Sequence, residues 1–173
     1  MVLGMSLSTF TLLHVILSLA GIGAGFIVVY GLLNRKRLDG WTAIFLATTV
    51  LTSATGFLFP FEKVLPAHVL GVLSLIVLAI AIWARYGGRL EGSSRWTYVV
   101  TAALALYFNC FVAVVQAFEK IPALKVLAPT QKEPPFLVAQ LVLLALFIWM
   151  TLAATKRFRL ESPLLRRTAN AGR

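Results

Sequence analysis

The chain has 173 residues, of which 60% are hydrophobic and 13% charged, and its formal net charge at pH 7 is +10. Soluble domains average about 45–50% apolar and about 25% charged residues, so a surface in contact with lipid rather than water is expected. The length allows a single domain, residues 1–173. The one cysteine, Cys110, excludes an intramolecular disulfide and a cysteine-based metal cluster, and the sequence predicts no other metal site.

Five apolar runs are long enough to cross a bilayer as helices, which takes about 20 residues each. Each run is continuously apolar instead of alternating, which excludes transmembrane β-strands. Turn-forming residues separate the runs, with four prolines between Glu119 and Pro135. The sequence therefore predicts an all-α integral membrane five-helix bundle with spans at Thr9–Leu33, Trp41–Phe59, Ala67–Ala84, Trp96–Phe118 and Phe136–Thr155.

The basic residues are divided unequally between the two ends of these spans, and this predicts the orientation. By the positive-inside rule the richer side is cytoplasmic, which puts the N-terminus outside and the C-terminus inside. Because the charges flank membrane spans, they fit anionic lipid headgroups and not nucleic acid. The first connection, the third connection and the tail hold 12 of the 16 Lys and Arg residues: Arg35, Lys36, Arg37, Arg85, Arg89, Arg95, Lys156, Arg157, Arg159, Arg166, Arg167 and Arg173.

Short motifs recur along the chain and indicate an internal duplication. Phe61-Glu62-Lys63 returns as Phe118-Glu119-Lys120, in both cases shortly before a Pro-Ala pair. Arg37-Leu38-Asp39-Gly40 returns as Arg89-Leu90-Glu91-Gly92, and more weakly at Arg159. We interpret the chain as a helical hairpin written twice, at 9–66 and 67–122, followed by one extra helix in a half repeat at 136–162. Convergent loop chemistry is the alternative.

His14 and His68 are the only histidines, and they occupy equivalent positions in the two copies. At about 1.5 Å per helical residue, both lie roughly 30–35 Å from the inner boundary, near the outer edge of the hydrocarbon. Imidazole is a common axial ligand of haem, so His14 and His68 are candidate cofactor-binding residues for haem b or a quinone. The simpler interpretation is that both histidines are structural.

Uncharged polar residues gather in the outer half of the predicted bundle and suggest a pocket there. Gly21 and Gly25 form a small-xxx-small pair that lets another helix approach closely, so their face of the first helix is expected to contact protein. His14 lies on the same face as these two glycines. The candidate pocket-lining residues are Ser18, Thr52, Thr55, Asn109, Gln116 and Gln140.

No Asp, Glu, Lys or Arg lies inside the five predicted spans, and no Gly-x-Ser-x-Gly motif occurs. Ion-coupled transport and acid–base or nucleophilic catalysis rely on such groups, so an enzyme is not expected. The preferred interpretation is a binding, accessory or scaffold protein, with another membrane protein or a second copy of this chain as a possible partner. The alternatives are a haem- or quinone-binding redox component and a carrier or channel for a small neutral solute.

Three stretches of the chain carry a family resemblance that extends over nearly its whole length. They are the run from His14 through Trp41-Thr42 to Pro60, the start of the fourth span at Trp96-Thr97-Tyr98-Val99-Val100, and the segment from Ala128 to Phe136. Together they resemble a family of short bacterial inner-membrane proteins of uncharacterised activity. The resemblance implies a multi-pass protein of the bacterial cytoplasmic membrane, and it implies no active residue. The translocator protein family is similar in length and span count only.

Overall fold

The computed structural model describes Val2 and residues 4–60 and 66–158. The helices in chain order are α1 (Leu7–Leu33), α2 (Asp39–Gly56), α3 (Pro66–Ile82), α4 (Ser93–Lys120), the short α5 (Pro122–Leu127) and α6 (Pro134–Arg157), and a π-helical turn, Trp83–Gly87, follows α3 directly. No strand occurs in the part of the chain that the structure describes, apart from an isolated bridge near the N-terminus. The all-α prediction is confirmed.

The ends of the helices follow local chain chemistry. Ser6 caps α1 because its side chain accepts a hydrogen bond from the Thr9 amide. Proline occupies the first turns of α5 and α6, where the missing N–H costs nothing. The proline-rich connection predicted between Glu119 and Pro135 therefore contains one short helix, α5.

Four of the helices are long and apolar enough to cross a membrane: Leu7–Leu33, His68–Gly87, Ser93–Lys120 and Pro134–Arg157. The chain is therefore a multi-pass membrane protein by helix length and composition, and its apolar helices contact lipid. The second predicted span corresponds to α2, which has 18 residues and ends at Gly56 instead of Phe59. Seven of those residues are Thr, Ser or Asp, and α2 is not among the four helices that are apolar enough to count as candidate spans.

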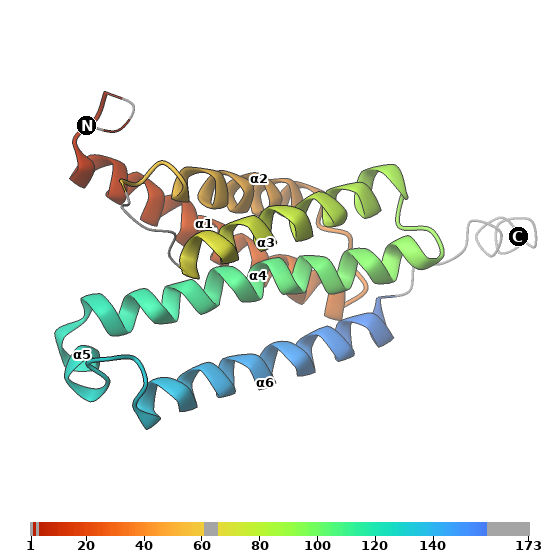
Figure 1. The fold of residues 1–173 in the computed structure, drawn as a ribbon. Coiled ribbons are helices and arrows are strands. Elements are labelled where there is room, and N and C mark those ends of the chain that lie inside the picture. Colours follow the sequence, from red (N-terminus) through yellow and green to blue (C-terminus); the bar gives the residue numbers. More distant parts are fainter. Residues whose placement is uncertain (1, 3, 61–65, 159–173) are drawn as a thin grey trace, which may run out of the picture.

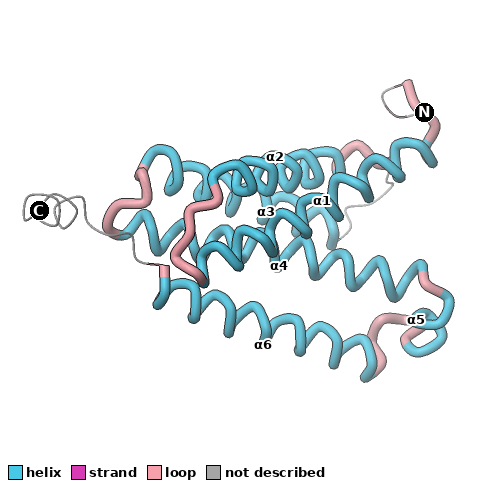
Figure 2. Tube along the Cα trace, turned by 180° about the vertical axis from the view of Figure 1, so that it is seen from behind, coloured by secondary structure: helices cyan, strands magenta, loops and turns pink. Residues whose placement is uncertain are grey.

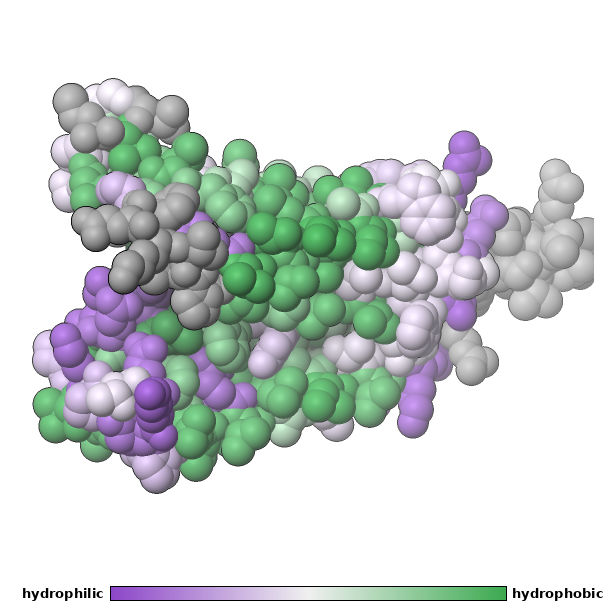
Figure 3. Space-filling view, viewed as in Figure 1, coloured by the Kyte–Doolittle hydropathy of each residue, from purple (hydrophilic) through white to green (hydrophobic). Residues whose placement is uncertain are grey.

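Helices α1 to α4 pack antiparallel to their neighbours along the chain, and α6 lies against α4 and α1 on one side of them (Figures 1 and 2). The connections at 34–38 and 88–92 and the end of α6 meet at one end of the bundle, as the alternating topology predicts. The face in Figure 3 has apolar residues along its middle and hydrophilic residues gathered at both ends. This is the pattern that a bilayer requires of a bundle of spanning helices.

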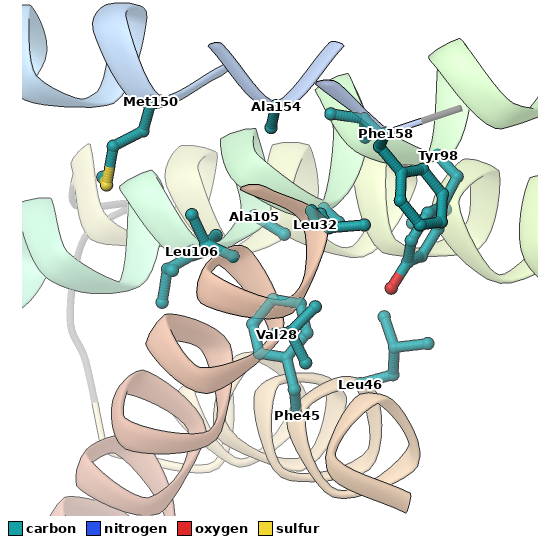
Figure 4. Packing of buried hydrophobic residues seen from close by; sticks show 14 of the residues in the cluster. Val28, Leu32, Phe45, Leu46, Tyr98, Ala105, Leu106, Met150, Ala154 and Phe158 are labelled. Atoms are coloured by element: carbon teal, nitrogen blue, oxygen red, sulfur yellow. The ribbon is translucent and has the colours of Figure 1, made fainter. Parts of the chain in front are cut away.

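The main core lies where α4 meets α1, α2, α3 and α6. Its most buried members include Phe45, Leu78, Tyr98 and Leu106 (Figure 4). A second, smaller cluster of Phe118, Ala128 and Phe136 joins α5 and its flanking turns to the ends of α4 and α6.

The duplication is neither supported nor contradicted by the described residues. The segment Phe61 to Lys63 and the motif beginning at Arg159 lie outside them. The two hairpins that the duplication implies, α1 with α2 and α3 with α4, are both present as packed pairs. The internal repeat thus stays a prediction.

Candidate binding site in the helical bundle

A cluster of uncharged polar side chains lies at the middle of the bundle, where α2 and α4 meet α1 at Gly21. A Cβ atom placed on Gly21 would lie 3.1 Å from Thr49 Oγ1 and 3.2 Å from both Asn109 Nδ2 and Thr48 Oγ1. Three polar atoms from two other helices therefore converge on the bare backbone of α1. The predicted close approach at Gly21 and Gly25 is confirmed, because both glycines are buried against α2 and α4.

Most of the hydrogen-bonding capacity of this cluster is unused. Thr49 Oγ1, Thr52 Oγ1 and Asn109 Nδ2 are buried and have no hydrogen-bond partner. Thr49 is 1% exposed and Asn109 is 9% exposed. Thr48 Oγ1 donates to the Ile44 carbonyl at 2.7 Å, which leaves its lone pairs free to accept. A buried polar group without a partner costs about 1–3 kcal/mol, so a cluster of them calls for a physical reason.

His14 lies toward the N-terminal end of α1 and is bound to α2. Its Nδ1 is 2.9 Å from Thr55 Oγ1, and its ring meets Phe59 edge-on at 5.1 Å between centroids. The Thr55 hydroxyl also lies 2.7 Å from the Leu51 carbonyl, to which it can donate while it accepts from His14 Nδ1. Ser18 Oγ donates to the His14 carbonyl at 2.8 Å within α1.

His68 lies on α3, beside the same end of α2. Its ring centroid is 5.9 Å from that of Phe57. Thr55 and Phe57 are two residues apart in an α-helical turn, so their side chains point to opposite sides of α2. His14 and His68 therefore meet α2 from opposite sides.

The two predicted glutamines lie away from the central cluster. Gln140 on α6 is 9% exposed, and its Nε2 donates to the Phe111 carbonyl of α4 at 3.3 Å. Its Oε1 is buried without a partner. Gln116 is exposed near the C-terminal end of α4. Of the six predicted pocket residues, Asn109 belongs to the central cluster, and Thr52 lies three residues after Thr49 along α2. Ser18 and Thr55 are hydrogen-bonded to His14.

Arg85 is the functional candidate that the sequence analysis missed, because it was assigned to a connection and proves to be buried in the bundle. It belongs to the π-helical turn and is only 4% exposed. Its guanidinium pairs with the Asp39 carboxylate at the start of α2 and lies 5.2 Å from the ring centroid of Tyr98. Its Nε has no partner. The spacing of Leu78, Ala81 and Arg85, at i, i+3 and i+7, is the signal that could have found it.

The Arg85 cluster continues into the bundle through hydroxyl groups. Tyr98 Oη is 3.4 Å from Thr42 Oγ1, and both residues are at most 2% exposed. Arg37, in the connection before α2, also binds Asp39: its Nε donates to the carboxylate at 3.3 Å. Arginine inside a π-helical turn is notable because such turns often occur at functional sites.

The described residues also form an apolar groove, and they form no candidate metal site. An apolar groove of about 240 Å³ lies between α4 and α6 and is lined by residues that include Tyr107, Leu144 and Phe147. Among residues 4–60 and 66–158, no group of three or more His, Cys, Asp or Glu side chains is placed to hold a metal ion.

Comparison of the chain with protein-family models, with curated proteins and with solved structures gave no match. The family resemblance described above therefore stays an expectation. The class that the fold defines is a multi-pass α-helical membrane protein.

Proposed function

We propose that the protein is a non-enzymatic membrane protein that binds a small uncharged polar molecule between α1, α2 and α4. The observation that carries the proposal is the convergence of Thr49 Oγ1, Asn109 Nδ2 and Thr48 Oγ1 on Gly21, with the first two unpaired. Thr52 Oγ1, also unpaired, lies almost one helical turn farther along α2.

The chemistry of the cluster defines the class of ligand. Asn109 Nδ2 offers donors, Thr48 offers acceptor lone pairs, and the Thr49 hydroxyl can do either. The three side chains that lie nearest to Gly21 are all uncharged. A neutral molecule with both a donor and an acceptor matches this set, whereas an ion would lose its hydration with no opposite charge to replace it.

The placement of the histidines favours binding in this cluster over the redox interpretation. A haem b site would use both histidines, but His14 is bonded to Thr55 of α2 and the His68 ring packs against Phe57, so each histidine contacts a different residue at the end of α2.

Saturation-transfer NMR with acetamide tests the proposal, because acetamide is neutral and carries both a donor and an acceptor. The intact protein in lipid nanodiscs should transfer saturation to acetamide, and Asn109→Leu and Thr49→Val should each abolish the transfer. Thr151→Val is the matched control, because the Thr151 hydroxyl is already bonded to the Phe147 carbonyl on α6. Equal transfer in the wild type and in both site variants would overturn the proposal.

A further inference from the structure

The apolar groove between α4 and α6 occupies only one half of the length of these helices. Its lining runs from Val100 to Tyr107 on α4 and from Leu144 to Leu152 on α6. The two helices are packed antiparallel to each other (Figure 1). Both lining segments therefore lie between the middle of the bundle and the end where α4 begins and α6 ends.

The lining of the groove favours a hydrocarbon occupant. Tyr107 and Thr151 carry its only polar side-chain atoms, and the other lining side chains contain carbon alone. The Thr151 hydroxyl is already bonded to the Phe147 carbonyl at 2.7 Å. The Tyr107 ring packs edge-on against the Phe147 ring, with 5.6 Å between the centroids. Burial of apolar surface is thus the main interaction that the groove can offer a ligand.

The rim of the groove is shaped for a flexible chain and not for another helix. Helices in membranes pack closely through small residues on their surfaces. Here the small residue Ala103 is only 3% exposed, whereas Leu104, Ile148 and Leu152 are 36%, 52% and 55% exposed. A second helix would meet these bulky branched side chains first, while an acyl chain can lie between them.

The extent of the groove matches one leaflet of a bilayer. On α4, the row of Leu104 and Val100 continues at the same spacing of four residues to Trp96, which is 59% exposed. Tryptophan favours the level of the lipid headgroups. The axial distance from Trp96 to Tyr107 is about 16 Å, close to half of the hydrocarbon thickness of about 30 Å. An acyl chain that enters beside Trp96 would therefore end near Tyr107.

Positive charge is present where the groove reaches the end of the bundle. On α6, the row of Ile148 and Leu152 continues at the same spacing to Lys156, and Arg157 follows it. Both basic side chains are exposed. Among the described residues, neither of them has a hydrogen bond or an ion pair. Two free cations thus lie at the headgroup level of the groove.

The whole of this end of the bundle is basic, so the field there attracts anions. It carries eight of the eleven Lys and Arg residues that the structure describes, from the connections 34–38 and 88–92, the π-helical turn and the adjoining ends of α4 and α6. Its acidic residues in the described part of the chain are Asp39 and Glu91. Asp39 is occupied by Arg37 and Arg85.

We propose that the groove between α4 and α6 binds one acyl chain of an anionic phospholipid whose phosphate lies beside Lys156 and Arg157. A zwitterionic lipid fits less well, because its headgroup adds a cation to a basic surface. This site is separate from the Gly21 cluster, which lies between α1, α2 and α4, so either proposal can fail without the other.

The first test compares two lipids that differ only in headgroup charge, dioleoylphosphatidylglycerol and dioleoylphosphatidylcholine. Native mass spectrometry of the full chain, released from detergent, measures the affinity for each lipid. Phosphatidylglycerol should bind more tightly, and Lys156→Gln combined with Arg157→Gln should weaken its binding about tenfold without affecting phosphatidylcholine. The matched control is Lys125→Gln with Lys132→Gln, which removes two exposed charges at the other end of the bundle. Equal losses in the two double variants would overturn the proposal.

The second test fills the groove without changing a charge. Ile148→Trp should lower the affinity for both lipids at least fivefold, because the indole ring takes the place of the acyl chain. Leu141→Trp is the control, since Leu141 lies two turns earlier on the same face of α6, is 62% exposed and does not line the groove. Both substitutions point toward lipid and leave the core intact.

Two results of this second test would reject the lipid site. One is phosphatidylglycerol binding in Ile148→Trp that equals that of wild type and Leu141→Trp. The other is a wild-type dimer that Ile148→Trp alone dissociates, which would place a second copy of the chain against the groove.

Discussion

Arg85 is the residue whose environment departs most from what its type leads one to expect. A guanidinium that is only 4% exposed loses most of its hydration. The Asp39 carboxylate and the rings of Tyr86 and Tyr98 take the place of the lost water. Asp39 holds Arg85 and Arg37 at once, while its own side chain is 65% exposed. The ion pair therefore joins the start of α2 to the π-helical turn after α3, with the charge of Arg85 buried and that of Asp39 accessible.

Removing Asp39 should destabilise the protein because it leaves Arg85 buried without a counter-charge. Breaking a fully buried pair costs about 3–5 kcal/mol, and the exposure of Asp39 reduces our expectation for Asp39→Asn to about 2 kcal/mol. The free energy of unfolding in detergent measures the effect. The double variant Asp39→Asn with Arg85→Met should be less destabilised than the sum of the two single variants.

An exposed ion pair on the same protein provides the comparison. Lys120 and Glu119 lie 3.3 Å apart, with side chains 70% and 48% exposed. Glu119→Gln should change the free energy of unfolding by less than about 0.5 kcal/mol, since exposed pairs contribute little. Equal effects of Asp39→Asn and Glu119→Gln would contradict a structural role for the Arg85 pair.

Glu133 should make stability depend on pH at the start of α6. Desolvation acts to raise the pKa of Glu133, but hydrogen bonds accepted from Thr130 and from the backbone of Lys132 outweigh it and lower the pKa below its ordinary 4.5. A lowered folded-state pKa stabilises the protein above pH 4.5, and this contribution disappears as the pH falls through the lowered value.

The measurement is the difference in melting temperature between wild type and Glu133→Gln as a function of pH. Wild type should be more stable near pH 7, and the difference should shrink below pH 4.5. Titration of the Glu133 carboxyl carbon by NMR gives the pKa directly. A midpoint above 4.5 would show that the hydrogen bonds to Thr130 and Lys132 are absent in solution.

At the scale of the helices, the packing of α1 depends on two glycines that differ sharply in their surroundings. A Cβ on Gly25 would lie 2.5 Å from Leu106 Cδ1, whereas one on Gly23 would meet nothing within 4 Å. Gly25→Ala must therefore displace the Leu106 side chain and press on the Phe45 ring. Gly23→Ala places its methyl group in open space on the exposed side of the helix.

We expect Gly25→Ala to lower the free energy of unfolding by about 1–3 kcal/mol, the usual cost of overpacking a core. Gly23→Ala should be neutral or stabilise by up to about 1 kcal/mol, because alanine favours the helix more than glycine does. The free energies of unfolding of both variants, measured in mixed detergent micelles, test this prediction. A tolerated Gly25→Ala would mean that α1 does not approach α4 as closely as the structure has it.

The extent of the long helices could be predicted because it depends on local chemistry. Lipid requires an unbroken apolar run, and prolines and charges limit it, so the predicted bounds of α1, α4 and α6 agree with the structure to within three residues. The burial of Gly21 and Gly25 followed from their spacing alone. The continuation of the third helix past Ala84 was not predicted, because a charged residue such as Arg85 usually ends a span. In the structure Asp39 of α2 pairs with Arg85 and lets it stay buried in the bundle.

Contacts between helices depend on how each helix is rotated about its axis, and the sequence does not contain that angle. From the sequence, His14, Thr55 and Asn109 were predicted to lie together in the outer half of the bundle. The structure places His14 with Thr55, and places Asn109 with Thr49 at mid-length beside Gly21. Thr49 was not among the predicted pocket-lining residues, because its burial depends on the rotation of α2 against α1 and α4.

At the scale of the whole molecule, the role of α2 determines how the chain lies in the membrane. Its interior side is polar, with Thr42 and Thr49 buried, while Trp41, Ile44 and Leu51 are exposed on the opposite side. Burial of Thr42 and Thr49 in the bundle makes the lower apolarity of α2 compatible with a position in the bilayer. Its 18 residues extend about 27 Å, close to the hydrocarbon thickness of about 30 Å.

We therefore expect α2 to be a fifth span, and the positions of the two termini test this directly. Five crossings place the N- and C-termini on opposite sides of the membrane, whereas four crossings place them on the same side. Protease protection of terminal epitope tags in inverted vesicles should expose the N-terminal tag to the lumen and the C-terminal tag to the outside, in line with the positive-inside rule. Both tags on one side would exclude α2 as a span.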